Sequence, residues 1–312
     1  MTTSNFTMKV NNDINLGCGD VSLDKKLGGY YQDFREAIYH FDNNSLGRFD
    51  GNGIPYLVEK DRDVYSIVYV IQYALIQFEF MVHEGQSEER LDIFKNCIAW
   101  LDEKAEDFKD AVVWRSEKNI QYNLPKGWTS SMYQGQSASL YLRAYQLFGD
   151  DKYLETAEKA IKFLKYNYNE GGVKRIDENG YVWFEEYPTD PPSFVLNGFV
   201  YTLFGILDLY RVTGSEEAKS LYEECIKTLE NNLHKYHRWY WSIYDQKKEQ
   251  LVSFYYQKNV HIPLMDILSK LTKKPIFARY HSKWTRQLQR PLNRLIVQLM
   301  YRIQPRLKRL RK

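Results

Sequence analysis

Hydrophobic and polar positions along the chain define two alternating kinds of helical segment. The first kind, apolar or small on most faces as in helices that are buried all round, is found at about 63–82, 134–147, 195–212 and 260–271. The second kind has apolar residues at i, i+3, i+4 and i+7 and a charged outer face, and is found at about 88–106, 151–167 and 215–234. The alternation predicts a repeated pair of one inner and one outer helix.

Short breaks separate the two helices of each pair. Gly85, Gly149 and Gly214 end three of the inner segments, and Pro275 opens the segment after the fourth. Ser or Asp follows each glycine as a helix N-cap, with Glu in two of the first turns that follow. Units of this kind cannot bury their apolar faces alone and must stack. We therefore predict a mainly α protein, an incomplete (α/α) barrel or toroid of about four helical hairpins.

The loops between the pairs have strand character and are rich in aromatic residues. Hairpins are predicted between Val112 and Trp128, over 172–184 and over 239–254. All three loops join an outer helix to the next inner one, so they should crowd one mouth of the barrel, where clefts form. We divide the chain into an irregular N-terminal lead-in at 1–60, the barrel at 61–288 and a C-terminal segment at 289–312.

Composition excludes several classes of protein. With 44% hydrophobic and 27% charged residues, the 312-residue chain is neither disordered nor fibrous. Its three cysteines are far apart and lack a CxxC spacing, which argues against a disulfide framework or a zinc site. No signal peptide or membrane-spanning run is visible, so a cytoplasmic location is expected. The 26 Tyr, 16 Phe and 7 Trp are typical either of proteins that stack on ring-shaped ligands or of an aromatic core.

Charge is distributed very unevenly. Residues 273–312 hold 13 Lys or Arg and no Asp or Glu, whereas the whole chain has a net charge of only +3. Such a tail is typical of contact with an anionic surface, and no specific nucleic-acid partner is expected. Within it, an apolar arc of one helix comprises Leu292, Leu295, Ile296, Leu299, Met300 and Ile303. We interpret 289–312 as a basic amphipathic helix that is peripheral at an anionic membrane. A last outer helix packed on the barrel, or a tail that binds polyanions, are the alternatives.

Three clusters carry candidate chemistry. Glu186 and Tyr187 follow a predicted strand and could act as a general base and a proton carrier. A Glu-Tyr-Pro sequence also occurs where a strand simply ends, without any catalytic role. Gln134 and Gln136 could bind sugar hydroxyls, or this helix could simply pack closely through Gly135. Trp128 and Tyr133 of the same region could stack on a sugar ring. The third cluster includes Tyr244, Tyr256 and His261, the last of which could equally be a core histidine.

These motifs together resemble a known family. The matching runs are Met132–Ser137, Gly171–Val173, Trp183–Thr189, Ser193–Gly198 and Ile243–Asp245. In order and spacing they are similar to the C-terminal catalytic domain of D-glucuronyl C5-epimerases, over roughly residues 45–290. The resemblance implies an α/α barrel and the inversion of C5 in a hexuronic acid, D-glucuronate to L-iduronate, within a polysaccharide or glycolipid-linked glycan. It implies no oxidised cofactor, and we predict neither cofactor nor metal.

The resemblance also implies roles for individual residues. The catalytic pair falls on Glu186 and Tyr187. Relatives tend to read Tyr-His-x-x-His-Ile at the fourth inner helix, whereas here Gln257 lies four residues before His261. A shift of one residue assigns the second tyrosine to Tyr256. His261 and Lys247 are assigned to charge stabilisation, and the wall of the site to Trp128, Tyr133, Gln134, Gln136, Trp183, Asn197 and Tyr244.

Other functions remain open at this stage. A polysaccharide lyase or a glycoside hydrolase could use the same kind of toroid, and a homologue without activity could still bind glycans. The sequence is also compatible with a homodimer.

Overall fold

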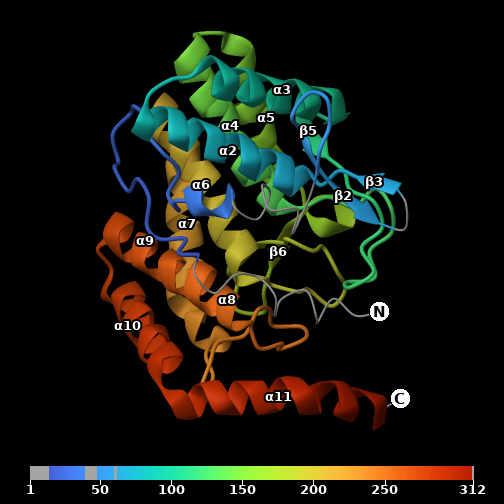
Figure 1. The fold of residues 1–312 in the computed structure, drawn as a ribbon, viewed down its shortest axis with the longest axis vertical. Helices are drawn as coiled ribbons and strands as arrows, with labels where there is room; N and C mark the ends of the chain where they lie inside the picture. The colour runs from blue at the N-terminus through green and yellow to red at the C-terminus, as the bar shows by residue number, and fades with distance from the viewer. Residues whose placement is uncertain (1–13, 39–47, 60–61, 311–312) are drawn as a thin grey trace.

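Pairs of inner and outer helices build the molecule, as the hydrophobic pattern predicts (Figure 1). The structure is a computed structural model that describes residues 14–38, 48–59 and 62–310. The inner helices are α2 (Ile67–Glu84), α4 (Ser131–Phe148), α6 (Leu196–Thr213) and α9 (Ile262–Thr272). Their outer partners are α3 (Glu88–Lys104), α5 (Asp151–Lys162), α7 (Glu216–Asn232) and α10 (Pro275–Gln289). The fold is an incomplete (α/α) barrel.

Capping residues end and begin these helices where the sequence predicts. The Ser87 and Ser215 hydroxyls accept hydrogen bonds from backbone N–H groups in the first turns of α3 and α7. Gly149 and Gly214 adopt left-handed conformations, with φ of 69° and 73°, and donate backward to close α4 and α6. The chain can therefore reverse directly from each inner helix to its outer partner.

Two inner helices cross in backbone contact. A Cβ atom on Gly205 of α6 would lie 2.1 Å from the carbonyl oxygen of Gly135 of α4, and one on Gly135 would lie 2.4 Å from the Cα of Thr202. No side chain fits at either position, so both glycines set the distance between the helices. Close packing at Gly135, which the sequence offered as one interpretation, is confirmed.

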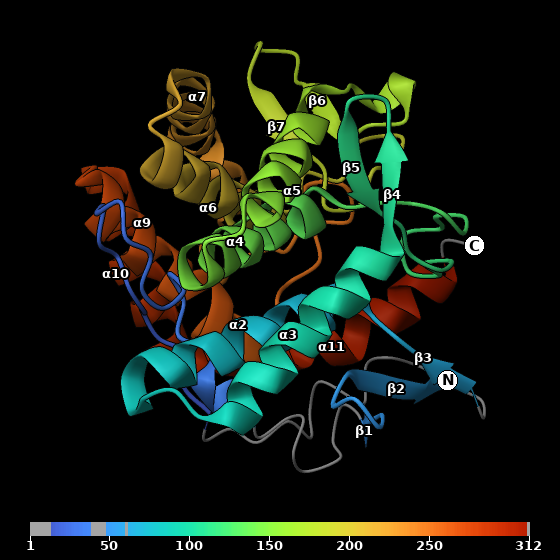
Figure 2. The same ribbon diagram turned by 90° about the horizontal axis from the view of Figure 1, so that it is seen from above.

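Short strands occupy two of the three predicted loops (Figure 2). Strands β6 (Lys174–Ile176) and β7 (Val182–Phe184) form the expected antiparallel hairpin. The pairing of the first loop differs, because β5 (Ala111–Trp114) pairs with β4 (Ala105–Phe108) and only one bridge joins Ser116 to Trp128. In the third loop, isolated bridges replace the expected hairpin. Short helical turns complete the connections, namely η2 (Phe163–Lys165), η3 (Tyr168–Glu170), η4 (Leu233–Tyr236), α8 (Phe254–Tyr256) and η5 (Gln257–His261).

Part of the N-terminal region, predicted as an irregular lead-in, contains short strands. Strands β1 (Arg48–Phe49), β2 (Pro55–Glu59) and β3 (Arg62–Val64) form an antiparallel sheet. Before them, residues 14–37 contain one short helical turn, η1 (Arg35–Ala37), and yet bury Tyr30 and Tyr31 completely. We call residues 14–37 the N-terminal plug. The remaining parts of the lead-in, 1–13 and 39–47, lie outside the described residues.

Buried charges hold the N-terminal plug against the last turns of α4 and α6. Arg143 of α4 donates to the carbonyl oxygens of Gly28 and Gly29 and forms a 2.8 Å ion pair with Asp208 of α6. Tyr31 also donates to Asp208, over 2.7 Å. Arg211 donates to the carbonyl oxygen of Asp24. The plug thus closes the barrel at the C-terminal ends of these inner helices, opposite the mouth that carries the loops.

Helix α11 (Pro291–Leu310) follows α10 and runs across one end of the molecule, with the C-terminus at its far end (Figure 1). Among the described residues, no helix is both long enough and apolar enough to cross a membrane.

Candidate active site

Backbone hydrogen bonds between loops assemble one polar cluster at the loop-bearing mouth. The N–H of Ser131, where α4 begins, donates to the carbonyl oxygen of Glu185 over 3.0 Å. The N–H of Leu196, where α6 begins, donates to the carbonyl oxygen of Tyr244 over 3.3 Å. The segment after β7, the third loop and the N-termini of two inner helices are therefore fixed relative to one another.

Glu186 lies at the centre of this cluster, against the first turn of α6. The Tyr244 hydroxyl donates to its Oε1 over 2.9 Å. A Cβ atom on Gly198 would lie 2.3 Å from its Oε2, so only glycine leaves room for the carboxylate there. Oε2 itself is buried and has no hydrogen-bond partner among the described residues. A buried acceptor without a partner is typical of a site that a ligand completes.

Burial raises the pKa of Glu186 to about 7. Nearby polar groups, led by the Tyr244 hydroxyl, oppose this rise because they favour the charged carboxylate. A carboxyl group that titrates near neutrality can both accept and release a proton at physiological pH. Glu186 therefore has the acid–base character of a general base.

Three tyrosines surround this carboxyl group. Burial raises the pKa of Tyr187, Tyr244 and Tyr256 well above the usual value, and the charge of Glu186 raises it further. Their hydroxyls consequently stay protonated at neutral pH. The Tyr256 ring lies 5.4 Å from that of Tyr244, edge to face. The cluster therefore combines one potential base with several proton donors.

A π-helical turn brings Tyr256 and His261 to the same face of the chain. The residues of η5 form a wide turn in which positions five apart share one face, and the Tyr256 and His261 rings lie 5.5 Å apart. Gln257 instead is buried in the core, where its side chain accepts from Ser242 and donates to the carbonyl oxygen of Trp284. Tyr256, and not Gln257, thus belongs to the cluster.

His261 is completely buried beside Ser242 and Trp284. Complete burial lowers its pKa to about 3. Nδ1 lies 2.8 Å from the Ser242 hydroxyl, and the ring stacks on Trp284 with 5.3 Å between the centroids. Burial favours the neutral imidazole, which argues against the predicted role of His261 in charge stabilisation. Its Nε2 has no partner among the described residues, so it can only offer a polar contact.

Aromatic rings form one side of the cluster. Tyr122 stacks parallel to Tyr187 with 4.1 Å between centroids, and its hydroxyl donates to buried Asp245 over 2.8 Å. Trp128 lies 5.4 Å from Tyr187 and 5.7 Å from Tyr133. The Tyr133 hydroxyl is 2.9 Å from that of Ser116. Flat faces of this kind suit the apolar face of a sugar ring.

Three buried amides on the inner helices have side-chain atoms without partners in the described part of the chain. Gln134 is fully buried, and neither atom of its amide has a hydrogen-bond partner among the described residues. Gln136 accepts from Gln72, but its Nε2 has no such partner, and neither does the Oδ1 of Asn197. These are the groups that could receive sugar hydroxyls.

Two predicted site residues lie elsewhere. Trp183 belongs to the core, where it packs on Phe194 and Phe199 at 4.9 Å and its indole N–H donates to Asp177. Lys247 is exposed and donates to the carbonyl oxygen of Asp190 over 3.3 Å. Lys248 lies closer to the cluster, with its Nζ 3.7 Å from the ring centroid of Tyr122.

Two residues that help to form the site, Tyr122 and Glu185, could not be recognised from the sequence. Tyr122 lies in an irregular loop without any periodicity. Glu185 stands beside Glu186 in the sequence but points to the loop ahead of α6, where it accepts from the Ser193 hydroxyl and the Phe194 N–H. Phe194 is held there with a φ of 45°. Glu185 is therefore a positioning residue, which only the three-dimensional contacts reveal.

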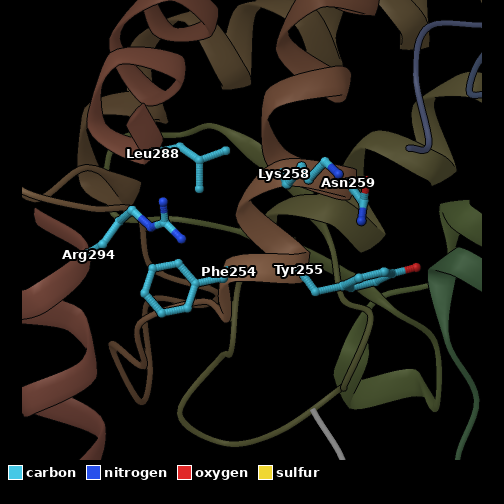
Figure 3. Close-up of a pocket in the computed structure, with 6 residues that line it drawn as sticks. All are labelled: Phe254, Tyr255, Lys258, Asn259, Leu288 and Arg294. Carbon is cyan, nitrogen blue, oxygen red and sulfur yellow. The ribbon is translucent and has the colours of Figure 1, made fainter. Parts of the chain in front are cut away.

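A cavity of about 280 Å³ lies next to the cluster, between the π-turn, the end of α10 and the start of α11 (Figure 3). It is lined by Phe254, Tyr255, Lys258, Asn259, Leu288 and Arg294. None of these residues belongs to the cluster around Glu186. Within the described ranges, no three His, Cys, Asp or Glu side chains gather as metal ligands would.

Comparisons with known proteins identify the family of the chain. Residues 73–286 match the family model of the D-glucuronyl C5-epimerase C-terminus. A D-glucuronyl C5-epimerase from Caenorhabditis elegans is 35% identical over 178 residues, which cover 52% of this chain and 29% of that protein. An uncharacterized protein from Methanocaldococcus jannaschii is 35% identical over 167 residues, covering 52% of this chain and 53% of its own length. The chain thus spans about half or less of these relatives.

Solved structures share the fold at low sequence identity. A family 76 α-mannanase from Bacteroides thetaiotaomicron superimposes with a TM-score of 0.53 at 16% identity, covering 81% of this chain and 68% of that one. A sugar epimerase from a ruminal bacterium gives 0.53 at 15% identity, covering 80% and 68%. These likenesses establish an α/α toroid. The family model matches more than half of the chain, so the chain belongs to the D-glucuronyl C5-epimerase C-terminal domain family.

Proposed function

We propose that this protein is a carbohydrate epimerase that inverts C5 of a hexuronic acid, D-glucuronate to L-iduronate, within a polysaccharide or glycolipid-linked glycan. The observation that carries the proposal is the buried Glu186, whose pKa is about 7, among tyrosines that stay protonated. The C5 hydrogen lies next to a carboxylate, so its removal needs a base on one ring face and a proton donor on the other.

The proposed reaction balances without an oxidant. Ionised Glu186 takes the C5 proton, and the electron pair of the broken C–H bond moves into the substrate carboxylate as an enediolate. A tyrosine hydroxyl on the opposite face then gives its proton to C5. Tyr256, which comes from α8, and Tyr187, which follows β7, are the two candidates for this donor. Transfer of the first proton from Glu186 to the resulting tyrosinate, directly or through solvent, restores the site.

The walls of the site support a sugar substrate. We propose that Trp128 and Tyr133 stack on sugar rings and that the unpartnered amides of Gln134, Gln136 and Asn197 bind hydroxyl groups. Lys248, which lies over Tyr122, is better placed than Lys247 to attract a uronate carboxylate. A cytoplasmic location, a homodimer and the division at residues 61 and 289 remain predictions from the sequence.

A polysaccharide lyase and a glycoside hydrolase would each need a different arrangement of catalytic groups. A lyase would remove the same proton but expel the C4 substituent. A retaining or inverting hydrolase needs a second free carboxyl group, and Glu185 is held by Ser193 and Phe194. A non-catalytic homologue would need only the aromatic and amide walls.

The test is NMR detection of deuterium at C5 when heparosan and other glucuronate polymers are incubated with the protein in D₂O. We expect exchange together with new iduronate signals, and we expect Glu186→Gln and Tyr187→Phe to abolish both. Glu117→Gln and Tyr181→Phe, which change residues outside the cluster, are matched controls and should keep the activity.

Three results would contradict the proposal. Ultraviolet-absorbing unsaturated products would indicate a lyase, and new reducing ends would indicate a hydrolase. Binding without any exchange would indicate a glycan-binding homologue.

A further inference from the structure

As far as its side chains are described, up to Ile303, helix α11 contacts the rest of the protein through one of its faces. Asn293 and Val297 are buried, and the Asn293 amide donates to the carbonyl oxygen of Gln287. One turn further, the Tyr301 hydroxyl donates to the carbonyl oxygen of Leu251 over 2.7 Å. The spacing of four residues between these positions defines a stripe that faces the body of the molecule.

A second stripe of α11 faces away from the body and is apolar. Leu292, Leu295, Leu299 and Ile303 are 64%, 52%, 44% and 43% exposed. They are separated by three, four and four residues, so they line one side of the helix. Of the six residues in the apolar arc seen in the sequence, only Ile296 and Met300 are partly buried against the body, and the other four are exposed. Packing on the barrel does not account for the other four.

The sequence around this stripe is strongly basic. Residues 273–312 carry 13 Lys or Arg and no acidic residue, which no other part of the chain matches. Arg302 is exposed beside the stripe, and Arg306, Lys308 and Arg309 continue the sequence of the helix. A purely electrostatic contact would not need four exposed leucine and isoleucine side chains, and a purely apolar contact would not need the charge. An interface between acyl chains and anionic headgroups matches both.

We propose that α11 lies on the surface of an anionic phospholipid bilayer, with Leu292, Leu295, Leu299 and Ile303 in the boundary between headgroups and acyl chains. Arg302, which is exposed beside the stripe, then lies at the phosphate layer, and the other basic residues of this part of the sequence add to the positive charge at that surface. The barrel is carried at the membrane by a helix parallel to its surface. This proposal stands on α11 alone and does not depend on the proposed catalytic function.

The experiment is co-sedimentation of the full chain with vesicles of phosphatidylcholine, with and without phosphatidylglycerol. We expect binding to the anionic vesicles only. The triple variant Leu292→Gln, Leu295→Gln, Leu299→Gln should bind at least about tenfold more weakly. The variant Arg306→Gln, Lys308→Gln, Arg309→Gln should bind on the order of a hundredfold more weakly. Ile120→Gln with Ile176→Gln, two exposed apolar residues of the barrel loops, is the matched control and should bind normally.

Circular dichroism and the thermal unfolding midpoint identify any variant that fails to fold, and because the substituted leucines are exposed we expect both to be unchanged. Vesicle binding that survives the leucine substitutions but disappears in salt, with equal binding to heparin or DNA, would overturn the proposal in favour of a polyanion-binding tail. Absence of vesicle binding would overturn it as well. A sedimentation profile that changes from dimer to monomer in the leucine variant, without lipid binding, would instead assign the stripe to a second copy of the chain.

Discussion

At the scale of single residues, the environment of Glu186 determines the pH at which its carboxyl group ionises, and under the proposed function this sets the pH dependence of the reaction. Its pKa of about 7 is the result of burial, opposed by polar neighbours such as the Tyr244 hydroxyl at 2.9 Å. A base must be ionised to accept a proton. The tyrosines around it ionise only far above neutral pH.

We therefore predict that the rate of C5 exchange rises with pH, with its midpoint near pH 7. Tyr244→Phe removes a hydrogen bond that favours the charged carboxylate, so the midpoint should move to higher pH. Tyr240→Phe, in the same loop but without such a contact, should leave it in place. The pH–rate profile of deuterium incorporation measures both, and a flat profile would rule out Glu186 as the base.

The π-turn separates the roles of two neighbouring residues. Tyr256→Phe removes only a hydroxyl in the cluster, so we predict that C5 exchange falls about a hundredfold with little change in stability. Gln257→Leu leaves the buried Ser242 hydroxyl without one of its partners, so it should cost about 1–3 kcal/mol of unfolding free energy. Folded Gln257→Leu should remain active. Urea unfolding and exchange assays on both variants give the comparison, and the opposite pattern would place Gln257 in the site.

Sequence reasoning found most of this cluster because it lies in short runs with characteristic chemistry, such as Glu186 and Tyr187. It assigned the second tyrosine to Tyr256 only by a shift of one residue against the family pattern, because the spacing to His261 depends on whether the backbone makes an α or a π turn. It also placed Trp183 in the site wall, since an aromatic residue beside a catalytic pair has the same sequence signal whether it faces the ligand or the core.

At the scale of elements, helix periodicity was the reliable signal. The inner and outer helices occupy nearly the predicted ranges, because each buries a face whose residue types and spacing are visible in the sequence. Strand pairing was harder to predict from the sequence. The expected helix at 88–106 ends at Lys104, and the residues that follow it become β4, the partner of β5. Two short strands bury too little surface for their pairing to be recognised locally.

The crossing of α4 and α6 yields a prediction at this scale. In Gly205→Ala the new methyl group would overlap the Gly135 carbonyl oxygen, so the helices must separate. We expect a loss of at least about 1–3 kcal/mol in unfolding free energy. Gly51→Ala is the matched control, because nothing lies within 4 Å of its added Cβ. Denaturant titration distinguishes the two, and equal stability would show that this crossing is not tightly packed.

At the scale of the whole molecule, the N-terminal plug is the feature that sequence patterns did not anticipate. Its contacts join residues more than a hundred positions apart, such as Gly28 and Gly29 with Arg143, and most of them are backbone carbonyls that carry no sequence signal. The only visible clue was the burial-prone pair Tyr30 and Tyr31, which has no helical or strand period.

Asp208 connects the plug to two inner helices, because it faces Arg143, Arg211 and the Tyr31 hydroxyl. Asp208→Asn would leave two buried guanidinium groups without their counterion, and we predict a loss of about 3–5 kcal/mol in unfolding free energy. Limited proteolysis should then cut within residues 14–37. Glu106→Gln, which removes an exposed ion pair with Arg115, is the control and should have little effect. Unchanged stability of Asp208→Asn would show that the plug is held by its apolar side chains alone.

The plug also determines how a long substrate could move. A toroid that is open at both ends would let a polymer pass along its axis, one sugar after another. Here the far end is filled by buried tyrosines and by the Arg143–Asp208 pair. The barrel is accordingly a cup. Under the function proposed above, a uronate that binds at Glu186 would have to enter and leave through the same rim. Successive units of one chain are then presented by repeated docking at that rim and not by threading.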